Sequence, residues 1–142
     1  MKNIFLDTNI VIDFLADRKP FSPDVAKLFN FSVLGKIKIY ISAVSYNNIY
    51  YILRQSLSNA ETIKLLEELS EMAEIADVTK SVIKKSLKTD FKDFEDAIQY
   101  YCALSLHKID FIVTRDTKDF KKSILSIMTP REAVSLLESI RR

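Results

Sequence analysis

Short apolar runs alternate along this chain with longer segments whose apolar residues recur at helical spacing. The candidate strands are residues 4–6, 36–42, 74–78, 111–114 and 127–128, and the candidate helices are residues 10–16, 22–35, 43–57, 59–72, 79–87, 93–107 and 129–140. Strands that alternate with helices, with almost no hairpin signals, are typical of a parallel sheet. We therefore predict an α/β fold in which helices flank a mainly parallel central sheet of about four or five short strands.

Polar residues in front of the helical segments indicate where several helices begin. Side chains such as Ser, Thr, Asn and Asp accept a hydrogen bond from a free backbone N–H of the first turn. Two of these positions are followed by proline, which suits the first helical position. The predicted N-cap residues are Ser22, Asn59, Thr79, Asp93 and Thr129.

Nothing in the chain marks a boundary between domains. Its 142 residues, 48% of them apolar, suit one globular domain, and there is no repeat, linker or low-complexity segment. Residues 1–142 are therefore expected to form a single domain. The apolar runs are shorter than the roughly 18 residues of a membrane span, and the lone Cys102 cannot form an internal disulfide. The first residues lack the basic and apolar regions of a secretory leader, so we expect none. We expect a cytoplasmic protein with no membrane partner.

The scarcity of three residue types excludes several kinds of chemistry. The single glycine, Gly35, cannot build a Gly-rich phosphate loop or a dinucleotide-binding turn. One histidine, His107, and one cysteine cannot supply the usual ligands of a zinc site. The net charge of +2 gives no overall signature of nucleic-acid binding. Carboxylates remain as the groups that could carry out chemistry.

Acidic residues follow two of the predicted strands. Asp7 follows the strand at 4–6, and Asp116 comes just after the strand at 111–114. The carboxyl ends of parallel strands meet at one edge of a sheet, which is where ligands bind in such folds. Carboxylates held close together attract Mg²⁺ or Mn²⁺. Asp7 could equally serve only to cap the helix that follows it.

The helix at 93–107 begins with three acids. Asp93 and Asp96 are three residues apart and share a face, whereas Glu95 is expected to point elsewhere. Asp96 is the better candidate for a site, because the inner face of the helix continues from it through Ala97. The plainer interpretation is that Asp93 caps the helix and that all three acids suit the helix dipole.

Three motifs together resemble the PIN domain family, in this order and over nearly the full length of the chain. They are Leu6-Asp7-Thr8-Asn9, Asp96-Ala97 with Ala103 seven residues after the acid, and the stretch from Thr114 to Phe120. The resemblance implies a metal-dependent endoribonuclease, as in the VapC-type toxins of bacterial toxin–antitoxin pairs. By this resemblance, Asp7, Asp96 and Asp116 are the catalytic and metal-binding residues, with Mg²⁺ or Mn²⁺ as cofactor. The auxiliary positions are Asn9, Asn48, Asp93 and Asp119.

One position departs from the family pattern. The family usually places a glutamate in the helix after the second strand, and the matching residue here is Asn48. An amide adds no charge, so we expect weaker binding of a cation. The alternative function is therefore a PIN-like module that binds RNA or a protein without cleavage. A third class, a phosphoryl-transfer domain with Asp7 as nucleophile, is disfavoured because Asp7-Thr8-Asn9 lacks a second acid.

Basic residues surround the predicted acidic edge. Arg115, Lys118, Lys121 and Lys122 are candidates to contact the RNA backbone, although such residues also commonly form an ordinary solvated surface. The resemblance further suggests a homodimer and a small antitoxin protein as partner.

Overall fold

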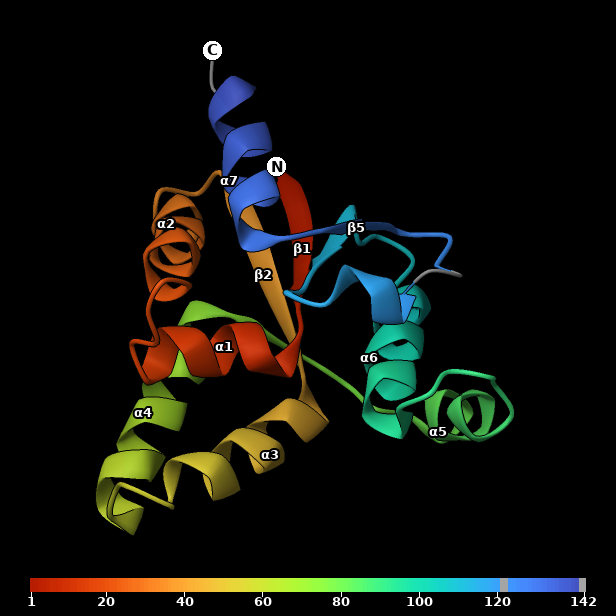
Figure 1. Ribbon diagram of the computed structural model, residues 1–142, viewed down its shortest axis with the longest axis horizontal. Helices are drawn as coiled ribbons and strands as arrows, with labels where there is room; N and C mark the ends of the chain where they lie inside the picture. The colour runs from red at the N-terminus through yellow and green to blue at the C-terminus, as the bar shows by residue number, and fades with distance from the viewer. Residues whose placement is uncertain (121–122, 141–142) are drawn as a thin grey trace.

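A five-stranded sheet, all of whose neighbouring strands are parallel, lies at the centre of the computed structural model, which describes residues 1–120 and 123–140 (Figure 1). The strand order is β3-β2-β1-β4-β5, so the chain builds outward from β1 first in one direction and then in the other. The predicted α/β fold is confirmed. The strands are β1 (Lys2–Leu6), β2 (Ile37–Ser42), β3 (Glu74–Ala76), β4 (Phe111–Val113) and β5 (Ser126–Met128).

Seven α-helices in the described part of the chain cover the two faces of this sheet. In Figure 1, α1, α2 and α4 lie to one side of β1 and β2, and α5 and α6 lie to the other. No helix among residues 1–120 and 123–140 is long and apolar enough to cross a membrane. The helices are α1 (Thr8–Leu15), α2 (Ser22–Val33), α3 (Ala43–Leu53), α4 (Asn59–Met72), α5 (Lys80–Leu87), α6 (Phe94–Ser105) and α7 (Pro130–Ser139).

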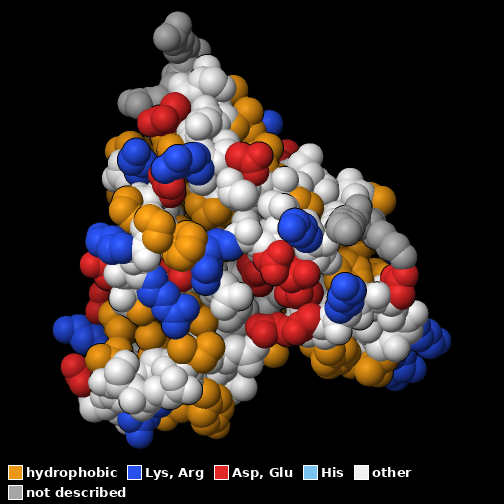
Figure 2. All heavy atoms as spheres, in the orientation of Figure 1, with side chains coloured by type: hydrophobic (Ala, Val, Ile, Leu, Met, Phe, Trp, Pro, Cys, Tyr) orange, Lys and Arg blue, Asp and Glu red, His pale blue; other side chains and the backbone are white. Residues whose placement is uncertain are grey.

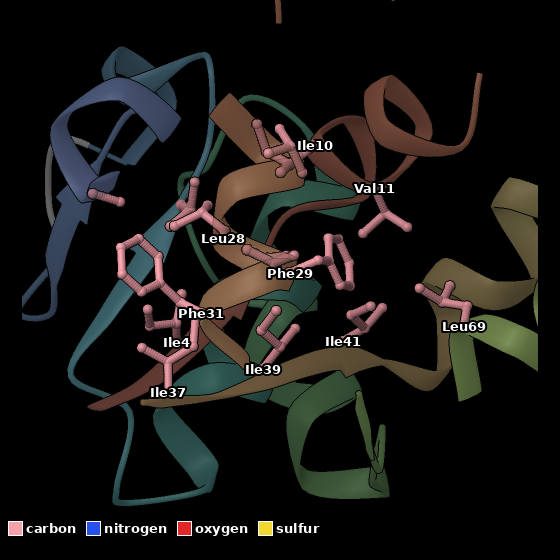
Figure 3. Close-up of a cluster of buried hydrophobic side chains, with 14 of the residues drawn as sticks. Ile4, Ile10, Val11, Leu28, Phe29, Phe31, Ile37, Ile39, Ile41 and Leu69 are labelled. Atoms are coloured by element: carbon pink, nitrogen blue, oxygen red, sulfur yellow. The ribbon is translucent and has the colours of Figure 1, made fainter. Parts of the chain in front are cut away.

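The alternation of side chains along each strand divides the core into two clusters. Ile4 and Leu6 of β1 join Ile39 of β2 in the larger cluster, where residues of α2 such as Leu28 pack against them (Figure 3). Phe5 of β1 points to the other face and packs in the cluster under α5 and α6. Because both faces of the sheet are covered, the strands are mostly apolar, and their polar residues, such as Lys2, Lys38 and Glu74, lie at or near the strand ends. The sheet is therefore a rigid base for the loops at its edges.

Two predicted N-caps are wrong, and each is displaced by one residue. Phe21, not Ser22, precedes α2; Ser22 is already the first helical residue, and its hydroxyl donates to Asp17 Oδ1 at 2.6 Å. Ser58, not Asn59, caps α4, because it forms a reciprocal pair of hydrogen bonds with Glu61 three residues on. The caps predicted at Thr79, Asp93 and Thr129 are confirmed.

Three helices end two or more residues earlier than predicted. The segment at 22–35 is helical only to Val33, the segment at 43–57 only to Leu53, and the segment at 93–107 only to Ser105. A short 3₁₀ helix over Thr117–Phe120 follows β4 and was not predicted. This turn determines where the acidic residues after β4 lie.

Thr129→Ala is expected to lower the free energy of unfolding by about 1 kcal/mol. The reason is that the Thr129 hydroxyl accepts from the backbone N–H of Glu132 at 3.2 Å, and the Glu132 carboxylate accepts from the backbone N–H of Thr129. Urea denaturation measures the change. Ser135→Ala, an exposed change on the same helix, is the control, and an equal loss in both variants would contradict the role of the cap.

Candidate functional site

Asp7 is fixed at the edge of the sheet where β1 and β4 end together. Leu6 pairs with Val113, so Asp7 and Thr114 follow side by side. The Asp7 carboxylate accepts from the backbone N–H of Thr8 at 2.8 Å through Oδ1 and from the Thr114 hydroxyl at 2.9 Å through Oδ2. Asp7 is therefore both the cap of α1 and a buried acid, only 6% exposed, that faces the loop after β4.

Four more acids meet near Asp7, two at the start of α6 and two in or just before the 3₁₀ turn. Asp93 caps α6 by accepting from the backbone N–H of Asp96 at 3.2 Å, which places Asp96 in the first turn. The carboxyl groups of Asp96 and Asp119 share a hydrogen bond, and Asp119 shares another with Asp116. The turn is held in place by Phe120, which is buried against the aromatic residues near α6. Residues far apart in the sequence thus form one acidic cluster.

The crowding of these acids is visible in their proton affinity. The pKa of Asp7 is raised to about 6, first by burial and then by the charges of Glu95 and Asp119, while the hydrogen bonds from Thr114 and Thr8 oppose the rise. Burial, followed by the charges of Asp7, Asp93 and Asp119, raises the pKa of Asp96 to about 7. The pKa of Asp119 is also raised, first by its hydrogen bond with Asp116. Such a cluster gains stability when it binds protons or a cation.

A pocket of about 440 Å³ opens onto the cluster. In Figure 2, acidic side chains gather at the centre of a hollow in the visible face, with basic side chains beside them. A somewhat larger pocket, of about 520 Å³, lies near Met1 and Gly35 and has only one acid, Asp110, in its lining. The acidic pocket is therefore the candidate site. Its lining residues are Asp90, Phe91, Lys92, Asp93, Asp96, Asp116, Lys118 and Asp119.

Two other predicted site residues, Asn9 and Arg115, do not line the acidic pocket. Asn9 is exposed on α1 and does not line the pocket. The guanidinium of Arg115 lies 2.8 Å from the buried carboxylate of Asp13 and stacks over the ring of Phe21. Lys118 does line the pocket. The two remaining predicted RNA contacts, Lys121 and Lys122, lie outside the described residues.

Glu95 leaves the face shared by Asp93 and Asp96, as expected, and does not line the pocket. Its Oε2 accepts from Asn48 Nδ2 at 2.7 Å and from the Thr8 hydroxyl at 3.0 Å, so the side chain reaches toward α1 and α3, contacts that were not expected. Helical spacing places the side chains of residues 95 and 96 on different faces. A long side chain in the first turn can nevertheless reach a neighbouring helix. Two features of the sequence could have indicated this contact. They are the glutamate beside Asp96 and the amide of Asn48 at a position where an acid was expected.

Gln99 is a second residue that the sequence analysis did not single out. It is fully buried, and its Nε2 donates to the hydroxyls of Thr8 at 3.0 Å and Ser45 at 2.9 Å. Its Oε1 has no hydrogen-bond partner among the described residues. A glutamine on the otherwise apolar inner side of α6 was the available signal. Gln99 links α6 to α1 and α3 behind the acidic cluster.

The donor atoms of the cluster suit a hard divalent cation, because they are all carboxyl oxygens that repel one another. The acids interact in pairs, Asp96 with Asp119 and Asp119 with Asp116. In the described ranges, no three or more His, Cys, Asp or Glu side chains surround one point where an ion could bind. The chemistry of the residues therefore fits a cation, and the acids would have to close around it.

Comparison with known proteins agrees with this geometry. The family model described as the PIN domain matches residues 3–118. Ribonuclease VapC1 of Aquifex aeolicus (strain VF5) is 21% identical over 136 residues, 92% of each chain. Two solved structures have the same fold. One is a toxin–antitoxin complex from Klebsiella pneumoniae, with 23% identity, a TM-score of 0.64 and coverage of 89% of this chain and 97% of that one. The other is Mycobacterium tuberculosis VapC20, described as a sarcin-ricin loop cleaving toxin, with 15% identity, a TM-score of 0.59 and coverage of 77% and 86%. Since the family pattern spans most of its length, this chain belongs to the PIN domain family.

Proposed function

We propose that this chain is an endoribonuclease that hydrolyses RNA phosphodiester bonds with the help of a divalent cation. The observation that carries the proposal is the acidic cluster at the ends of β1 and β4, in which Asp7 and Asp119 both raise the pKa of Asp96, and Asp119 also raises that of Asp7. The names of the similar proteins, a ribonuclease and a toxin that cleaves an RNA loop, support the same substrate class.

The proposed ligands of the cation, Mg²⁺ or Mn²⁺, are Asp7, Asp96 and Asp116, with Asp119 beside them. A bound divalent ion neutralises charge on phosphate oxygens and makes water a stronger nucleophile, so that no nucleophile from the protein is required. A second argument for a cation comes from the substrate. RNA is an anion, and a hollow lined by several carboxylates repels its phosphates unless positive charge is supplied.

The chain's own side chains hold the site ready and attract the substrate. Thr8 and Thr114 fix the two oxygens of Asp7 in separate directions. Asp93 fixes the backbone of Asp96. We propose that Lys118, at the pocket, contacts the RNA backbone.

We also propose an antitoxin protein as a partner and a homodimer as the assembly, both in the cytoplasm. The support for the antitoxin is the similar fold of the Klebsiella pneumoniae toxin–antitoxin complex. The dimer rests on the family resemblance alone.

The test is cleavage of labelled structured and single-stranded RNAs by the purified protein. We expect cleavage with Mn²⁺ or Mg²⁺, none after removal of the metal with EDTA, and recovery when Mn²⁺ is added back in excess. Cleavage that persists in EDTA would contradict the need for a cation. Absence of cleavage together with retained RNA binding would favour the alternative of a binding module, which the neutral Asn48 suggests.

A further inference from the structure

Two hydrogen-bond donors from different helices converge on one oxygen of Glu95. Asn48 of α3 and Thr8 of α1 both donate to its Oε2, at 2.7 and 3.0 Å. None of the hydrogen bonds within the described residues uses the other oxygen, Oε1. A carboxylate held in this way is orientated by one oxygen and can bind a ligand through the other.

The direction of the hydrogen bonds behind Glu95 explains why the side chain is held firmly. The buried amide of Gln99 donates to the Thr8 hydroxyl, which is then free to donate its own proton onward to Glu95. Ser45 accepts from the same amide and lies 2.6 Å from the Thr8 oxygen. The network therefore ends on the Glu95 carboxylate as an acceptor, so this acid is placed by interactions that begin in the core.

Glu95 is close enough to the acidic cluster to act on it. It accepts a hydrogen bond from Thr8, the residue that follows Asp7, and it stands beside Asp96 in the first turn of α6. No Lys or Arg in the described ranges forms an ion pair with Glu95. An additional negative charge beside Asp7, with no basic side chain to balance it, is costly in the protein alone and favourable once a cation binds.

We infer that Glu95 supplies a fourth carboxylate to the cation centre and that Asn48 is the positioning residue that holds it there. This inference rests on the proposed function. It means that the acid absent from α3 is replaced by one from α6, so that the site keeps its negative charge. A neutral amide at position 48 suits this arrangement, since a carboxylate there would repel Glu95.

The test compares the parent protein with three variants by calorimetric titration with Mn²⁺ at pH 7.5. Glu95→Gln is expected to weaken Mn²⁺ binding by about 10- to 100-fold. The double variant Asn48→Glu/Glu95→Gln, which returns a carboxylate to α3, should recover most of that loss. Asn48→Ala, which leaves Glu95 charged but unsupported, should fall between the parent and Glu95→Gln. Glu68→Gln, an exposed change on α4, is the control and should bind as the parent does.

Each alternative outcome is distinct. If the parent and Glu95→Gln bind Mn²⁺ equally while the parent still cleaves RNA, this inference fails and the proposed function stands. If Glu95→Gln lowers the melting temperature and the double variant recovers no affinity, the role of Glu95 is only structural and the inference is overturned. A parent protein that binds no Mn²⁺ and cleaves no RNA would overturn both proposals.

Discussion

Asp96→Asn is expected to lower the rate of cation-dependent RNA cleavage by at least roughly 10³-fold, which corresponds to about 4 kcal/mol of lost transition-state stabilisation. Asp96 lies at the middle of the acidic cluster, since it interacts with both Asp7 and Asp119. Asparagine keeps the size of the side chain but removes its charge, and with it a proposed ligand of the cation. The measurement is the initial rate of cleavage of one labelled RNA at saturating Mn²⁺.

Two controls make this result specific. Asp96→Asn is purified in the same way as the parent, so a contaminating nuclease would give equal rates in both. Glu68→Gln removes an exposed acid far from the site in the sequence and should cleave at the parental rate. Asp96→Asn should also melt no earlier than the parent in EDTA, because burial and the neighbouring acids make the charged form of the Asp96 carboxyl unfavourable. An unchanged rate in Asp96→Asn would refute the role of the cluster.

The positions of Asp7 and Asp116 could be predicted because they follow from chain topology. A short apolar strand that ends on an acid places that acid at the carboxyl edge of a parallel sheet, whatever the details of packing. The fold could be predicted for a similar reason, since the alternation of strands and helices leaves few arrangements. The link from Asp116 through Asp119 to Asp96 required the 3₁₀ turn over Thr117–Phe120, which has no strong signal of its own.

The position of Glu95 could not be predicted, because it depends on contacts between three helices. The direction of a helix face says where a side chain leaves the backbone, but not how far it reaches. Glu95 contacts Asn48 and Thr8 only because α1, α3 and α6 converge at this edge of the sheet. The hydrogen bond of Ser22 could not be predicted for a similar reason, since its acceptor, Asp17, lies in a loop whose course the sequence does not specify.

The free energy of unfolding, measured without divalent cations, is expected to fall as the pH rises from about 5 to 8. In the folded chain the pKa of Asp7 is raised to about 6 and that of Asp96 to about 7, both from an ordinary value of 3.8. Between these values the folded protein binds more protons than the unfolded chain, so each rise in pH favours unfolding. The full shift of the buried Asp7 corresponds to about 3 kcal/mol, of which roughly half is lost between pH 5 and pH 8 and the rest below pH 5. The half-buried Asp96 adds less than its shift implies because of solvent screening.

Urea denaturation in EDTA at pH 5 and pH 8 measures this difference, and Asp7→Asn identifies its source. The variant should lose less stability between the two pH values and should be more stable than the parent at pH 8, because the unfavourable buried charge is gone.

Saturating Mn²⁺ at pH 8 should recover much of the parent's lost stability, since an ion that binds only the folded state favours it. The gain should be far smaller in Asp7→Asn. Stability that rises with pH in the parent, or an equal effect of Mn²⁺ on both proteins, would mean that these carboxyl groups are not held together as proposed. The repulsion between these acids makes the protein less stable at neutral pH, and the same repulsion would give the site its affinity for a cation. Removing one of the acids should therefore raise the stability of the metal-free protein and weaken its binding of the cation.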